Sequence, residues 1–200
     1  MNKKISEDSK DKSVLDSEEK SIEQKLVESA QNGDSQAFGK LIRLHQKRLF
    51  RFIYSLTGSF DSAEDIVQEA FVKAYHNIKS FKAGYSFYPW LSTIARNSAY
   101  NYIAREEKKE SLDKMTESGF DPETKELGAL DALLDKENGK RFYKALSELP
   151  VNFRTVFTLR HLEKMDYSEI ASYLKIPPGT VDSRLYRARQ ILMEALKDLL

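Results

Sequence analysis

Arginine side chains cluster near the carboxyl end of this 200-residue chain, in a segment whose chemistry suits nucleic acid. Arg184, Arg187 and Arg189 fall within six residues and follow a turn that contains Gly179. A short helix, a tight turn and a second helix rich in arginine are typical of a helix-turn-helix, which places its second helix in the major groove of DNA. The residues therefore predict a DNA-binding helix that begins near residue 180.

Apolar spacing decides which face of this helix is free. Val181, Leu185 and Ala188 recur at steps of three and four residues, so we expect them to pack inward. Thr180 is expected to cap the helix, which would leave backbone N–H groups free for a phosphate. The alternative is a helical hairpin whose arginine-rich face only meets solvent. The residues predicted to contact DNA are Thr180, Asp182, Ser183, Arg184, Tyr186, Arg187 and Arg189.

A second region of interest is a negative ridge on a helix expected over residues 61–80. Asp65 and Glu69 are four residues apart, with Glu64 and Gln68 beside them. Like charges at this spacing repel by a few tenths of a kcal/mol in an isolated helix. Such a ridge is either a solvated face or a docking surface for a basic partner, and the spacing alone favours the solvated face.

Aromatic and cationic side chains alternate between residues 81 and 102, which is the combination that single-stranded DNA binding needs. Trp90, Leu91 and Ile94 keep a helical spacing and are better explained as core. Gly84 places its neighbours on a loop, which could form a pocket for an unstacked base. The residues left for that pocket, or for the cations beside it, are Lys82, Tyr85, Ser86, Tyr88, Arg96, Asn97 and Tyr100.

Other kinds of chemistry find little support in the composition. The chain has no cysteine and only three histidines, His45, His76 and His161, which are too far apart for a metal-binding pair. Its eight glycines form no phosphate-binding motif. The acidic ridge lies on one helix, which offers too few converging ligands for a metal. We therefore expect no metal, no cofactor, no small-molecule substrate and no enzymatic activity.

The elements that must position these groups are all predicted to be helices. Asp34 and Gly58 bound the first, and Asp61 with Glu64 resembles a capping box for the second. Pro89 suits the first turn of a third helix that ends near residue 102. Later, Pro150 separates two helices, and another begins at Asp166. No useful strand-like alternation occurs, so the fold class is all-α.

Charge divides the chain into four segments. Residues 1–20 form a polar head that we expect to be disordered, and residues 21–104 form a first helical domain. Residues 105–139 hold six basic and eleven acidic side chains, a net charge of −5, and are predicted to be a flexible linker with transient helix near 129–134. Residues 140–200 hold eleven basic and seven acidic side chains, a net charge of +4, and form the second domain. No stretch resembles a signal peptide or a membrane span, so we expect a soluble cytoplasmic protein.

Taken together, these motifs resemble a bacterial extracytoplasmic-function (ECF) sigma factor of RNA polymerase. Residues 61–75, DSAEDIVQEAFVKAY, are similar to the polymerase-docking helix of that family, and 81–97, FKAGYSFYPWLSTIARN, to its promoter-melting segment. Residues 149–150, LP, 167–171, YSEIA, and 179–189, GTVDSRLYRAR, resemble its helix-turn-helix. The likeness covers about 21–104 and 140–195, with the motifs in the family's order and spacing.

The resemblance implies roles that the spacing does not. Region 2, residues 21–104, would bind the coiled coil of the polymerase β′ subunit through Asp61, Glu64, Asp65, Gln68 and Glu69. It would also capture and melt the minus-ten promoter element through Lys82, Gly84, Tyr85, Ser86, Tyr88, Trp90, Arg96, Asn97 and Tyr100. Region 4, residues 140–200, would read the minus-thirty-five element and contact the β flap. An anti-sigma factor is a further partner by resemblance.

Two residues depart from the family pattern. Asp182 stands where the family often has arginine or lysine; a carboxylate can accept a hydrogen bond from cytosine N4, so promoter preference is expected to differ. Pro178 makes a double proline in the turn. A repressor or activator that uses only the helix-turn-helix is the remaining alternative, although no dimerisation helix is evident.

Overall fold

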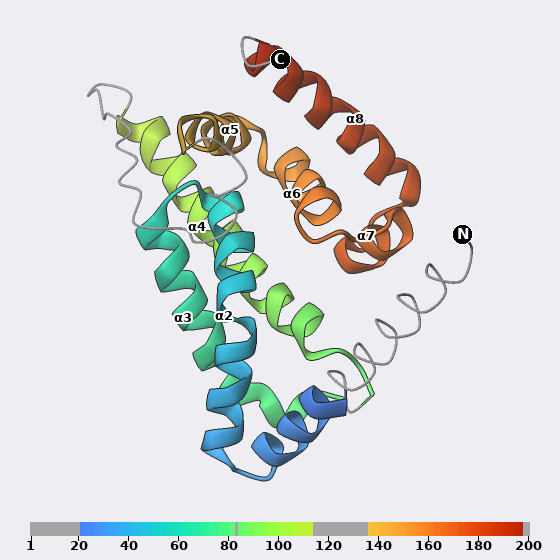
Figure 1. The fold of residues 1–200 in the computed structure, drawn as a ribbon. Coiled ribbons are helices and arrows are strands. Elements are labelled where there is room, and N and C mark those ends of the chain that lie inside the picture. Colours follow the sequence, from blue (N-terminus) through green and yellow to red (C-terminus); the bar gives the residue numbers. More distant parts are fainter. Residues whose placement is uncertain (1–20, 83, 114–135, 198–200) are drawn as a thin grey trace.

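The computed structural model describes residues 21–82, 84–113 and 136–197, and within these ranges all regular structure is helical, as predicted. Residues 1–20, expected to be disordered, and 129–134, expected to form transient helix, lie outside them. The order of elements is a helix that includes residues 21–31, then α2 (Ser35–Thr57), α3 (Phe60–Asn77), the single turn η1 (Ile78–Ser80), α4 (Phe87–Asp113), α5 (Lys136–Glu148), α6 (Val151–His161), α7 (Tyr167–Leu174) and α8 (Pro178–Ala195) (Figure 1).

Both ends of α2 are where the sequence predicts them. The Asp34 side chain accepts hydrogen bonds from the backbone N–H groups of Gln36 and Ala37. At the other end Gly58 adopts φ +69°, a left-handed conformation that L-residues avoid because Cβ approaches the following carbonyl. Gly58 also lies against α5, since a Cβ placed on it would be 2.7 Å from Cβ of Ser147.

Replacing Gly58 with alanine is expected to lower the free energy of unfolding by at least about 1–2 kcal/mol, the cost of the left-handed conformation. The crowding against Ser147 adds to this loss. The control is Gly39→Ala in the middle of α2, where a Cβ has room and alanine should instead gain about 0.5–1 kcal/mol. Urea denaturation measures both, and equal stabilities would contradict the prediction.

Several predicted boundaries are wrong. Helix α3 begins at Phe60, and the hydroxyl of Ser59 caps it by accepting from the N–H of Ser62, so Asp61 and Glu64 do not form a capping box. Helix α4 continues to Asp113 and α5 begins at Lys136, so residues 105–113 and 136–139, predicted as linker, are helical. Both stretches are polar, and apolar periodicity therefore does not reveal these extensions.

Helices α2, α3 and α4 pack side by side as a bundle (Figure 1). Large apolar side chains of α2, including Leu49, Phe52 and Ile53, are almost fully buried in it. Helices α3 and α4 contribute small residues, Ala63, Ala70, Ala74, Ala95 and Ala99, to the same core. Small side chains let helices approach closely, and this bundle fixes the directions of the ridge on α3 and of the groups on α4.

The second block contains the predicted helix-turn-helix. Asp166 and Glu169 form a capping box at the start of α7, as expected, and hydrogen bonds within this exposed box lower the pKa of Asp166. Helix α8 crosses α6 and α7 and buries the side chains expected to point inward. These are Val181, Leu185, Ala188 and Leu192.

The two helical blocks also pack against each other. Apolar side chains from α2, α3, α4, α6, α7 and α8 belong to one continuous buried cluster. Arg154 of α6, itself buried, donates hydrogen bonds to the carbonyl of Leu56 at the end of α2 and to those of Ser147 and Leu149 at the end of α5. Because unpaired helix-end carbonyls are costly when buried, this one guanidinium ties three helices together.

Candidate nucleic-acid interface

The outward face of α8 is free, as the spacing predicts. Asp182, Ser183, Tyr186, Arg187 and Arg189 are exposed, opposite the buried stripe of the same helix. Arg184 is half-buried on its flank. The Ser183 hydroxyl donates to the carbonyl of Thr180 at 3.1 Å, so it is already used within the helix. Tyr186 and the arginines thus remain the groups best placed to meet a duplex.

Thr180 does not cap α8. The helix begins two residues earlier, at Pro178, and its N-cap Pro177 has no side-chain hydrogen bond to offer. Thr180 instead lies inside the first turn, where its N–H donates to the carbonyl of Pro177. Proline in the first turn needs no partner for its missing N–H, which is why the double proline starts the helix where a threonine cap was expected.

Six of the nine predicted minus-ten residues line one groove of about 730 Å³ between region 2 and the end of α7. Tyr85, 72% exposed, stands on the loop where Gly84 adopts φ +89°. Trp90 is half-buried and packs on Phe81, with 5.2 Å between ring centres. We call this hollow the aromatic groove; its predicted members are Lys82, Tyr85, Ser86, Trp90, Arg96 and Asn97.

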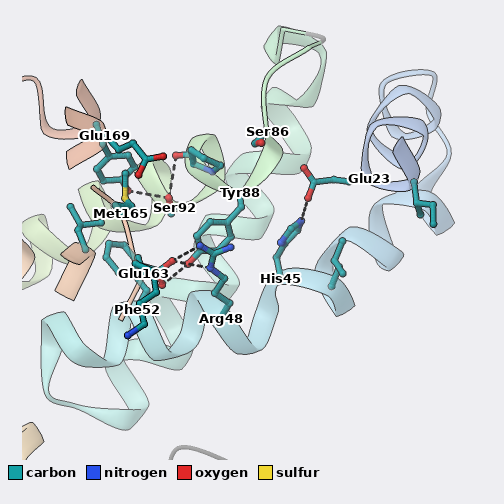
Figure 2. A pocket seen from close by; sticks show the side chains of 16 residues that line it. Glu23, His45, Arg48, Phe52, Ser86, Tyr88, Ser92, Glu163, Met165 and Glu169 are labelled. Atoms are coloured by element: carbon teal, nitrogen blue, oxygen red, sulfur yellow. Dashed lines mark hydrogen bonds and ion pairs between the residues drawn. The ribbon is translucent and has the colours of Figure 1, made fainter. Parts of the chain in front are cut away.

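Tyr88 does not face this groove. Its side chain is only 7% exposed, and its hydroxyl donates to Oε1 of Glu163 at 3.1 Å (Figure 2). The guanidinium of Arg48 lies 3.8 Å from the centre of its ring. Burial, reinforced by the Glu163 carboxylate, raises the pKa of Tyr88 far above its usual value. In this structure Tyr88 joins the two regions and is not available to a base.

Arg96 and Tyr100 are likewise engaged with region 4. A guanidinium N–H of Arg96 donates to the carbonyl of Tyr173 at 3.2 Å. The Tyr100 and Thr155 hydroxyls are 2.7 Å apart. Sequence reasoning missed these partners because they are 55 and 77 residues away along the chain. It missed Arg48, Glu163 and Arg154 for the same reason. For Arg154 there was a signal, because a charged residue within the apolar sequence of α6 suggests a buried polar contact.

The ridge predicted on α3 is exposed along its length. It consists of Asp61, Glu64, Asp65, Gln68 and Glu69, which we call the acidic ridge. Glu69 pairs with Lys73 at 2.7 Å, and this hydrogen bond lowers the pKa of Glu69. Val72 and Tyr75, both exposed, extend the surface by one turn with apolar groups. Val72 and Tyr75 follow Gln68 by four and seven residues, a helical spacing that indicates this extension.

A second hollow, of about 670 Å³, lies between the two regions (Figure 2). Its floor holds His45, whose Nε2 is 3.0 Å from a carboxylate oxygen of Glu23. The hydrogen bond with His45 lowers the pKa of Glu23. No group of three or more histidine or acidic side chains that could hold a metal occurs within 21–82, 84–113 and 136–197. Among those residues, no helix is both long and apolar enough to cross a membrane.

His161 is a half-buried histidine to which sequence reasoning gave no structural role. Its ring lies 4.4 Å from that of Phe157, and its Nε2 is buried with no hydrogen-bond partner. Burial lowers the pKa of His161 below its usual value, and the positive charges of Arg189, Arg160 and Lys164 lower it further.

Region 4 is therefore expected to lose stability in acid. The unfolded chain takes up the proton near pH 6.5 while folded His161 still resists it, so the free energy of unfolding declines as the pH falls below about 6.5. The decline ends once the pH is below the folded pKa. Chemical denaturation at several pH values measures it. His161→Phe should flatten this dependence, whereas His76→Gln, at an exposed position on α3, should not; equal slopes would refute the assignment.

Comparison with known proteins assigns a family model to each of the two helical blocks. The family model described as Sigma-70 region 2 matches residues 41–109, and that described as Sigma-70, region 4 matches 139–192. The RNA polymerase sigma-H factor of Pseudomonas aeruginosa is 35% identical over 184 residues, which are 89% of this chain and 95% of that protein. The ECF RNA polymerase sigma-E factor of Escherichia coli strain K12 is 33% identical, over 91% of this chain and 98% of its own.

A solved structure shows the same likeness in three dimensions. The sigma factor RpoE of Bartonella quintana, crystallised with the anti-sigma factor NepR, aligns with a TM-score of 0.65 at 30% identity, over 80% of this chain and 96% of that one. Such sigma factors are DNA-binding regulatory subunits and not enzymes. The chain belongs to the sigma-70 family, in the extracytoplasmic-function group of sigma factors that serve transcription initiation by RNA polymerase.

Proposed function

We propose that this sigma factor opens its promoters by holding the separated minus-ten strand in the aromatic groove. The observation that carries the proposal is the convergence of Lys82, Arg96, Tyr85 and Trp90 on one hollow. A base stacked on an aromatic ring contributes about 1–3 kcal/mol, and cations follow the backbone. Because these contacts need unpaired bases, they stabilise open over closed DNA, and that difference drives melting.

Region 4 would supply the duplex contacts. The exposed face of α8 carries Tyr186 and Arg187 toward the minus-thirty-five element, and Arg189 is placed for a phosphate. Asp182, beside them, would favour cytosine at one position. In this division region 2, which includes the whole of α4, and region 4, which begins with α5, are the working domains, and the segment between these two helices joins them.

The proposed protein partners follow from the exposed surfaces and from the relatives. The acidic ridge would dock on the β′ coiled coil, and region 4 on the β flap. Because the relative RpoE was solved with an anti-sigma factor, we include such a factor among the partners. A protein that acts on RNA polymerase and promoter DNA would be located in the cytoplasm.

Transcription in vitro tests the proposal directly. Purified core polymerase with this protein, supplied with a genomic DNA library, should yield transcripts that start at defined sites sharing two upstream elements. Permanganate footprinting should detect unpaired thymines near the minus-ten element only when both proteins are present. Start sites without an unpaired region would remove the melting role, and the absence of directed transcripts would overturn the proposal.

The duplex contact of Arg187 has its own expected result. Arg187→Ala should cost about 1–3 kcal/mol of promoter binding and relax the preference at one base position. Competition among promoter variants, measured with holoenzyme, shows whether the loss depends on sequence. The comparison is Arg189→Ala, which should weaken all sequences equally because it is placed for a phosphate. An equal loss on every sequence for Arg187→Ala would make that residue a phosphate contact as well.

A further inference from the structure

The helix at residues 21–31, called here the first helix, lies beside the loop that carries Tyr85 and leads into α4 (Figure 1). It precedes residues 41–109, the stretch that the region 2 family model matches. Val27 and Ala30, each 3% exposed, anchor it in the core of the bundle. Because packing fixes the position of this helix, its polar side chains can hold other parts of the chain in place.

Gln31, at the end of the first helix, holds the beginning of that loop. Its side-chain Nε2 donates to the carbonyl of Ile78 at 2.9 Å and to that of Phe81 at 2.7 Å. Phe81 also closes the turn η1, since its own N–H donates to the Ile78 carbonyl at 3.1 Å. The two N–H donors of one amide thus bind both ends of η1, the last regular element before the loop.

Glu23, about two turns earlier on the same helix, holds the other end of the loop. Its Oε1 accepts from the backbone N–H of Phe87, the first residue of α4, at 3.0 Å. Its Oε2 faces Nε2 of His45 on α2 (Figure 2). The first N–H groups of a helix have no partner within it, and a carboxylate is well suited to accept from them. The hydrogen bonds with His45 and Phe87 lower the pKa of Glu23 and so favour its charged form.

Between these two points the loop has few contacts to fix it. Its exposed residues are Lys82, Gly84, Tyr85 and Ser86. A hollow of about 180 Å³, lined by residues of both, lies between the loop and the first helix. A segment with few buried contacts opens at little cost in free energy. The bonds at its two ends are therefore what gives the loop a definite shape.

We propose that the first helix sets the selectivity of minus-ten capture, with Gln31 and Glu23 as positioning residues that hold Lys82 and Tyr85 in one arrangement. Neither positioning residue needs to touch DNA. This inference rests on the proposed function, since it assumes that the aromatic groove binds the separated strand. A loop that is ordered before binding loses less conformational entropy when a base arrives. A loop with one shape also excludes bases that a looser loop would accommodate.

The fluorescence of Trp90 tests the positioning without DNA. Trp90 is the only tryptophan of the chain, and its ring packs on Phe81, one of the two residues that are held. Gln31→Met removes both donors and keeps an unbranched side chain. Quenching of Trp90 by acrylamide should then increase by about 1.5-fold or more, because the freed loop exposes the ring. The control is Gln24→Met, the same change on the same helix, where the amide donates to Glu28 of that helix.

A pair of substitutions at Glu23 tests the other end of the loop. Glu23→Leu removes the acceptor for the N–H of Phe87, whereas Glu23→Gln keeps an oxygen that can accept it. Both remove one negative charge, so a general effect of charge on DNA binding cancels between them. Glu23→Leu should resemble Gln31→Met in acrylamide quenching, and Glu23→Gln should stay close to the parent.

Promoter selectivity tests the consequence for DNA. Holoenzyme with each variant is offered pairs of promoters that differ at one base of the minus-ten or of the minus-thirty-five element, and permanganate footprinting measures the open complexes. Gln31→Met and Glu23→Leu should lower the preference at the minus-ten base by about threefold or more and leave the minus-thirty-five preference unchanged. A variant that was only less stable would lose open complexes at every promoter alike, with both preferences intact.

The outcomes separate this inference from the proposed function. A parent protein that opens no promoter would overturn the proposed function, and this inference with it. A parent that opens promoters, together with an unchanged minus-ten preference in Gln31→Met and Glu23→Leu, would overturn the positioning role alone. Quenching in these two variants no greater than in Gln24→Met would overturn it as well.

Discussion

Reversing two charges on the acidic ridge will separate this sigma factor from core RNA polymerase. The variant with Asp65→Lys and Glu69→Lys is expected to bind core more than a hundredfold more weakly, a loss of about 2.7 kcal/mol. The introduced lysines would face the basic partner surface on which the ridge is proposed to dock, and like charges at an interface repel. The two carboxylates are exposed, so the fold does not depend on them. Pull-down of purified core polymerase over a range of concentrations measures the loss.

The matched control reverses two exposed charges elsewhere. Glu28→Lys with Glu194→Lys changes the net charge equally, outside α3, and should leave capture unchanged. Circular dichroism of both variants should match that of the parent. Undiminished capture by the ridge variant would make the ridge an ordinary solvated face.

Removing the guanidinium of Arg154 is expected to give the largest loss of stability of any single substitution considered. Arg154→Met keeps an unbranched apolar stem but leaves the carbonyls of Leu56, Ser147 and Leu149 without this donor. Hydrogen bonds to a charged group contribute about 1.5–3 kcal/mol each, so the total loss should reach about 3 kcal/mol or more. For a chain of this size that lowers Tm by about 6–12 °C.

Calorimetry of the full chain measures this difference. Arg141→Met, at an exposed position on α5, should leave Tm within about 1–2 °C, since surface changes alter stability by only about 0.5 kcal/mol. A similar small shift for Arg154→Met would mean that water replaces the guanidinium at no cost. The three-helix junction would then have another source of stability.

Local sequence signals predicted the helices well. Asp34 and Asp166 mark starts that their side chains do cap, and Gly58 marks an end that needs a left-handed residue. The stripe of Val181 and Leu185 is buried as its period requires. The start of α8 was predicted less accurately, because two signals competed there. Thr180 is a suitable N-cap residue, but Pro178 already fits the first turn, and the helix begins at Pro178.

The sequence predicted which residues belong to the candidate site, but not the direction in which each side chain points. Spacing placed Lys82 and Tyr85 near one another, whereas only the family resemblance added Trp90, and all three line the aromatic groove. It could not show that Tyr88 turns inward to Glu163, because the partner is 75 residues away. Helical periodicity identifies a buried face, but it carries no information about which distant polar group meets that face.

The unbroken length of α4 has a mechanical consequence. Its 27 residues form a rod about 40 Å long, which begins just after the loop that contains Gly84 and ends at Asp113. Because α4 is packed against α2 and α3, it would tilt together with them, and a tilt of about 10° would swing its far end by about 7 Å over that length. Strand capture at one tip could thus steer the path of the following segment without any other joint having to bend.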